Sequence, residues 1–175
     1  MVKVDVEGVV LNLTTHSPVV ILRSKAGQVL PIVIGIFEAQ AILLGLEKSA
    51  FPRPLTHDLI KVIVETMAGR MLRLEIDNLA QNVYHANVIL EIQGELRKID
   101  CRPSDGIALA IRFGAPVFAE DGLLEPADTI KYYKGKKFVK VHNMDKPIQK
   151  KEVEDFMKGI ENLSTQDFWK KLKEE

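Results

Sequence analysis

The chain has 175 residues, of which 46% are hydrophobic and 27% charged, a composition typical of one globular domain with a short appendage. Its 24 basic and 24 acidic side chains cancel, which argues against a basic protein that coats nucleic acid but permits local contact with a polyanion. A single cysteine, Cys101, excludes an internal disulfide framework. Without a long apolar segment or a signal-peptide pattern, we expect a cytoplasmic protein with no membrane partner.

The spacing of apolar residues predicts the secondary structure in chain order. Strands are expected over 2–13 with a bulge at Gly8, and over 19–22, 29–34, 71–77, 83–92, 96–100, 116–119 and 131–141. Helices are expected over 36–47, 56–68 and 102–113, with Gly69 just beyond the second helix. This order, with its many hairpins, predicts an α+β fold: a mostly antiparallel, twisted sheet wrapped around three helices.

A boundary near residue 145 separates this expected domain, 1–145, from a C-terminal tail, 146–175. Val153, Phe156, Met157 and Ile160 are spaced as on one face of a helix, and Phe168, Trp169 and Leu172 follow a second helix start. We expect a helical hairpin that packs either on the body or on a second subunit. The second case predicts a homo-oligomer, most simply a dimer.

Two segments share a pattern in which an arginine, a proline, a hydroxyl residue and an aspartate stand at a helix start: Arg53-Pro54-Leu55-Thr56-His57-Asp58 and Arg102-Pro103-Ser104-Asp105. A helix N-terminus with an arginine beside it suits a phosphate group. The pattern therefore assigns substrate binding to Arg53, Thr56, Arg102 and Ser104. Helix capping by Thr56 and Ser104 explains the same residues and, from residue types alone, is the more frequent case.

Three further observations bear on chemistry. His57, in the first turn of a helix, is expected to stay neutral at pH 7, and a neutral imidazole can ligate a metal or act as a base. A structural histidine that is hydrogen-bonded in a loop is, taken by itself, the more frequent case. If the helix starts converge, Glu38, Asp58 and Asp105 form a carboxylate cluster of the kind that binds Mg²⁺ or Mn²⁺. The stretch 131–140 combines five lysines with three aromatic residues; it fits either a single-strand groove that uses Lys136 and Lys137, or a lysine-protected sheet edge.

Three ordered segments together resemble the bifunctional nuclease domain family: Pro31-Ile32-Val33-Ile34-Gly35 with Glu38-Ala39, then the first Arg-Pro segment, then Asp100-Cys101-Arg102-Pro103-Ser104-Asp105-Gly106 with Ile107-Ala108-Leu109-Ala110. The resemblance covers about residues 2–141 and is closest to short bacterial members without a UvrB/UvrC-type motif. Cys101 and Gly106 depart mildly from the family pattern.

The resemblance implies a compact, roll-like α+β domain packed on three helices. It also implies a nuclease that hydrolyses DNA, RNA or both with little sequence preference, with Mg²⁺ or Mn²⁺ as the metal if one assists. It favours catalytic roles for His57, Asp58, Asp105 and Glu38. The alternative is a non-catalytic module that binds an anion or nucleic acid and regulates. Both interpretations use the same residues.

Overall fold

A computed structural model of the chain describes residues 1–12, 17–48, 51–127 and 138–140. Their strands form one sheet in the order β3-β2-β1-β7-β4-β5-β6, and β8 pairs with the far end of β1. All pairings are antiparallel except that of β4 with β7. The strands are β1 (Val2–Asn12), β2 (Pro18–Ser24), β3 (Val29–Val33), β4 (Gly69–Ala80), β5 (Val83–Ile92), β6 (Glu95–Cys101), β7 (Val117–Ala119) and β8 (Phe138–Lys140).

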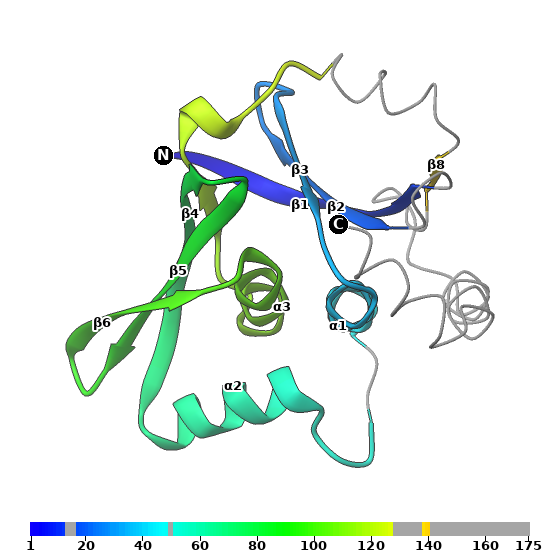
Figure 1. Cartoon of the computed structure of the whole chain (residues 1–175). Helices are drawn as coiled ribbons and strands as arrows, with labels where there is room; N and C mark the ends of the chain where they lie inside the picture. Colours follow the sequence, from blue (N-terminus) through cyan, green and yellow to red (C-terminus); the bar gives the residue numbers. More distant parts are fainter. Residues whose placement is uncertain (13–16, 49–50, 128–137, 141–175) are drawn as a thin grey trace.

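The sheet curves around the helices α1 (Ile36–Leu46) and α3 (Pro103–Phe113), while α2 (Thr56–Thr66) lies across the open side (Figure 1). A short 3₁₀ helix, Asp121–Leu123, follows β7. This arrangement confirms the expected α+β fold with three helices and a mostly antiparallel sheet. The expected bulge at Gly8 is also present, because the register of β1 against β2 shifts between Val6 and Gly8.

Helix α3 occupies the centre of the core, and its residues from Ile107 to Ala110 are almost fully buried. A Cβ atom on Gly106 would lie 2.3 Å from Leu74 Cδ1 of β4, so only glycine permits this approach of helix to sheet. On α1, a Cβ atom on Gly45 would lie 2.8 Å from an Nη atom of Arg112. These glycines therefore allow α3 to pack closely on β4 and the end of α1 to pack closely on the end of α3.

Neither hydroxyl residue caps its helix, contrary to expectation. Leu55 is the N-cap of α2 and Arg102 is the N-cap of α3, so Thr56 and Ser104 are already helical. In α3 the first helical residue is Pro103, which has no N–H to be capped and a backbone suited to that position. In α2 the side chain of Asp58, three residues after the N-cap, accepts a hydrogen bond from the backbone N–H of the N-cap residue Leu55.

The end of α2 also differs from expectation by one residue. Ala68, and not Gly69, takes the left-handed backbone conformation that ends the helix, with φ of 54°. Gly69 is instead the first residue of β4. A Cβ atom at Gly69 would lie 2.9 Å from the carbonyl oxygen of Val64, so glycine is required there for close approach to the helix.

Candidate functional site

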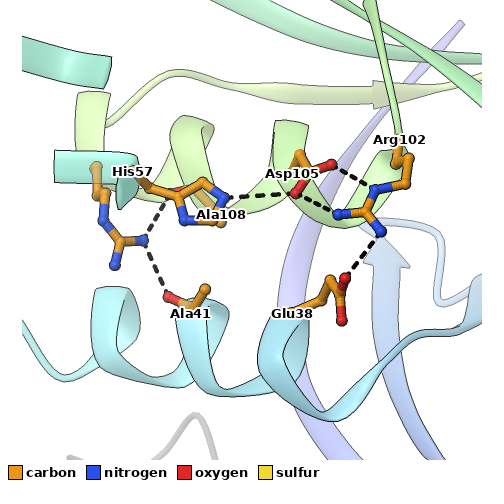
Figure 2. Close-up of polar contacts among 7 residues, drawn as sticks. Glu38, Ala41, His57, Arg102, Asp105 and Ala108 are labelled. Atoms are coloured by element: carbon orange, nitrogen blue, oxygen red, sulfur yellow. Dashed lines mark hydrogen bonds and ion pairs between the residues drawn. The ribbon is translucent and has the colours of Figure 1, made fainter. Parts of the chain in front are cut away.

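The first turns of all three helices contribute side chains to one cluster. Glu38 lies in the first turn of α1, His57 in the first turn of α2, and Asp105 in the first turn of α3 with Arg102 just before it. The two Arg-Pro segments therefore converge, as the sequence predicted if they formed one site. Figure 2 shows Glu38, His57, Arg102 and Asp105 pointing toward one another from the three helices.

Arg102 joins two carboxylates from different helices. Its Nε and one Nη donate to the two carboxylate oxygens of Asp105 at 2.7 and 3.1 Å, and its other Nη lies 2.9 Å from Glu38 Oε1 (Figure 2). The bond to Asp105 raises the pKa of Arg102, so the guanidinium remains a cation. Its side chain is 66% exposed, whereas that of Glu38 is 19% exposed. The guanidinium of Arg102 is therefore exposed to solvent, while the two carboxylates that bind it are less exposed.

His57 lies on the other side of Asp105. Its Nε2 is 3.6 Å from Asp105 Oδ1, and its side chain is only 14% exposed (Figure 2). Burial lowers the pKa of His57 below its ordinary value of 6.5 and the Arg112 guanidinium lowers it further, whereas Asp105 opposes the shift. The imidazole is therefore neutral at pH 7, with one nitrogen directed at a carboxylate that can orient the ring.

Arg112, in the last turn of α3, is the site-supporting residue that the sequence analysis missed. Its side chain is 7% exposed, and its Nε donates to Asp58 Oδ1 at 2.6 Å. One Nη donates to the carbonyl oxygens of Ala41 at 3.0 Å and of Ala108 at 2.9 Å. Figure 2 labels both alanines and marks these two hydrogen bonds with dashed lines. Lys61 donates to the carbonyl oxygen of Arg112 at 2.9 Å. One side chain thus binds α1, α2 and α3 together beside His57.

Asp58 is bound by Arg112 and by the start of its own helix. Besides the bond from Arg112, its other carboxylate oxygen accepts a hydrogen bond from the backbone N–H of Leu55 at 3.2 Å. This bond satisfies one of the free N–H groups at the start of α2. The structure therefore gives Asp58 two structural contacts, one with the helix start and one with Arg112.

The remaining Arg-Pro residues divide by exposure. Arg53 and Thr56 are exposed, and Arg53 makes no hydrogen bond or ion pair with another residue of the described ranges. Ser104 is buried, with 6% of its surface exposed, which leaves its hydroxyl little access to a substrate.

Cys101 stands next to Arg102, but burial, and then Asp105 and Asp100, raises the pKa of its thiol to about 11. The thiol is therefore protonated and a poor nucleophile.

The carboxylates proposed as metal ligands do not meet at one point. Glu38 and Asp105 are joined by Arg102, while Asp58 pairs with Arg112. Among the residues that the structure describes, no group of three or more histidine, cysteine, aspartate or glutamate side chains could hold a metal ion. In the structure the guanidinium of Arg102 occupies the position between Glu38 and Asp105.

Several expected features lie outside the described residues. They are Lys136 and Lys137 with most of the lysine-aromatic stretch, and the whole C-terminal tail from residue 146. Within the described part of that stretch, β8 pairs with residues 10–12 of β1. No helix in the described ranges is both long and apolar enough to cross a membrane.

Comparison with known proteins gives matches along most of the chain. The family model described as the bifunctional nuclease domain matches residues 20–131. An uncharacterized protein of Mycobacterium tuberculosis is 31% identical over 169 residues, which cover 96% of this chain and 98% of that protein. Bifunctional nuclease 1 of Oryza sativa is 27% identical over 62% of this chain and 35% of its own length. Bifunctional nuclease 2 of Arabidopsis thaliana is 25% identical over 61% and 33%.

Proposed function

Because this chain belongs to the bifunctional nuclease domain family, we propose that it hydrolyses phosphodiester bonds of DNA or RNA at the cluster of His57, Asp105 and Arg102. The observation that carries the proposal is the contact of two different side chains with one carboxylate. Asp105 lies against a buried neutral imidazole and also binds an exposed guanidinium. A base and a cation for phosphate are thereby held a few ångströms apart.

His57 is the general base in this proposal. Its Nε2 faces Asp105, which favours the tautomer with the proton on Nε2 and leaves the lone pair on Nδ1 to accept a proton. Nδ1 takes a proton from water as the water oxygen attacks phosphorus. The bond from phosphorus to the leaving oxygen breaks, and solvent protonates that oxygen. A positioned base of this kind contributes about 10²- to 10⁴-fold to a rate.

Arg102 binds the phosphate. Its bonds to Asp105 and Glu38 use three of the five N–H groups of the guanidinium, so two N–H groups are left for phosphate oxygens. The two carboxylates fix the plane of the guanidinium and so prepare it for a bidentate contact. Arg53, exposed before α2, supplies a further cation for the nucleic-acid backbone. Contacts to phosphate carry no base information, which agrees with little sequence preference.

We expect cleavage without an added metal, because the guanidinium of Arg102 supplies the positive charge between Glu38 and Asp105. The assay therefore compares single-stranded DNA and RNA with Mg²⁺, with Mn²⁺ and with EDTA. Retained activity in EDTA is the expected result. Activity that requires a metal would show that Arg102 leaves the carboxylates to make room for the ion, which contradicts this mechanism.

Asp105→Ala tests the site, and Asp100→Ala is the matched control. Asp105 orients His57 and Arg102, so its loss is expected to lower the cleavage rate by about 10²-fold. Asp100 is an exposed aspartate of β6, five residues earlier in the chain, and its loss should leave the rate unchanged. Equal trace cleavage by the wild type and both variants would identify a contaminating nuclease. Binding of nucleic acid without cleavage by the wild type would identify a binding module.

A further inference from the structure

Helix α2 exposes more apolar surface than a helix of a monomeric domain needs. Of its residues only Val64 is buried, at 8% exposure. Four large aliphatic side chains of the helix and the methionine that follows are between 37% and 52% exposed: Leu59, Ile60, Val62, Ile63 and Met67. Isolated apolar residues on a surface are ordinary, but five on a single helix form a contiguous patch, and such patches usually mark an interface.

Three of these side chains form a ridge. Leu59, Ile63 and Met67 are spaced by four residues and so lie in one row along the helix. The charged residues Asp58 and Lys61 project from the opposite side, where both contact Arg112 of α3. The ridge therefore points away from α3. In Figure 1, α2 lies at the lower edge of the described fold, with no other described element below it.

The charges around the ridge do not suit a nucleic acid or an anionic membrane as the occupant. Lys61 lies 3.7 Å from Glu65 on the same helix, and Asp58 pairs with Arg112. No basic residue is left unpaired along α2, whereas helices that bind anionic lipid carry several lysines or arginines beside the apolar face. The ridge is thus a neutral aliphatic surface, and its natural partner is another aliphatic surface of the same shape.

We propose that the ridge of α2 packs against the ridge of α2 in a second copy of this chain, around a two-fold axis near Ile63. A two-fold contact requires that one patch be complementary to itself, and rows of side chains spaced by four residues interdigitate in this way when two helices cross. This inference concerns the face of α2 and does not depend on the proposed nuclease activity.

The exposed area fits the apolar core of such an interface. At roughly 100 Å² of apolar surface for each aliphatic side chain and about half exposure, the five residues present on the order of 250 Å² per subunit. A standard interface buries about 800 Å² on each partner, with an apolar centre and a polar rim. These five side chains supply about a third of that area as its apolar centre. Because His57 begins the same helix, each end of the helix pair would carry one candidate site.

The test is the mass of the full-length protein in solution, measured by light scattering with size-exclusion chromatography. The wild type is expected at twice the chain mass of 19.7 kDa at micromolar concentration, and Ile63→Glu at the single mass. Val33→Glu is the matched control, because Val33 is 66% exposed and lies outside α2, on β3, which is an edge strand of the sheet. It should remain a dimer. A monomeric wild type would overturn the proposal. A dimer that survives Ile63→Glu would also overturn it and would place the contact elsewhere, for example on the C-terminal tail.

A second variant covers the case in which Ile63→Glu fails to fold. Helices that cross at an axial distance of 8–10 Å bring facing Cα atoms within the span of a disulfide, so Ile63→Cys should form a covalent dimer under mild oxidation. The wild type, which retains Cys101, and Val33→Cys serve as controls and should not cross-link. If Ile63→Cys remains a single chain on a non-reducing gel, the two ridges do not meet at this axis.

Discussion

His57→Ala is expected to lower the rate of nucleic-acid cleavage by about 10²- to 10⁴-fold, which is the contribution of a positioned general base. The residual activity comes from binding of phosphate by Arg102, which this substitution leaves in contact with Asp105 and Glu38. The matched control is His85→Ala, because His85 is an exposed histidine of β5, outside the three helices that form the cluster. Its rate should equal that of the wild type.

The measurement is single-turnover cleavage of a labelled oligonucleotide, with the fold of both variants checked by circular dichroism. A His57→Ala protein as active as the wild type would remove the base from the mechanism. Cleavage would then have to depend on other residues or on a metal that displaces Arg102.

Arg112→Met should lower the free energy of unfolding by about 3 kcal/mol, the lower part of the range for breaking one partner of a buried ion pair. Arg112 is 7% exposed and bonds to Asp58, Ala41 and Ala108, so methionine keeps the packing of the stem but leaves these acceptors without their donor. Asp58 is 37% exposed, so water can reach it, and the cost is expected to stay near the lower end.

The control for Arg112→Met is Arg70→Met. Arg70 is 69% exposed and forms an ion pair with Glu91 on the sheet surface, an arrangement worth at most about 1 kcal/mol. Urea denaturation of the two variants and the wild type measures the difference. Equal losses of stability in both variants would show that Arg112 does not hold the three helices together.

The convergence of the helix starts could be predicted from the sequence, whereas the means of holding them could not. The repeated Arg-Pro pattern indicated one site, and the structure adds the close contact of Gly45 with Arg112. Arg112 gave no such signal, because a basic residue in the last turn of a helix is ordinary. Its partner Asp58 is 54 residues away in the chain, and only the tertiary fold brings the two together.

The helix ends were predicted less well for a local reason, and the expected cluster of three carboxylates was predicted less well for a tertiary reason. A hydroxyl residue after a proline resembles an N-cap, but Pro103 starts the helix itself and moves the cap to Arg102. The three carboxylates were expected together because each stands near a helix start. The sequence does not show which arginine each one faces, and Arg102 and Arg112 divide them between two separate ion-pair groups.

The pH dependence of cleavage, compared with the titration of the His57 ring followed by NMR, tests most directly the claim that neutral His57 is the base. A base works in its unprotonated form, so the rate should fall as the pH drops through the pKa of His57. Burial and Arg112 lower that pKa, and therefore the midpoint should lie below the ordinary value of 6.5 and coincide with the NMR midpoint. A rate that stays constant while His57 becomes protonated would contradict the account.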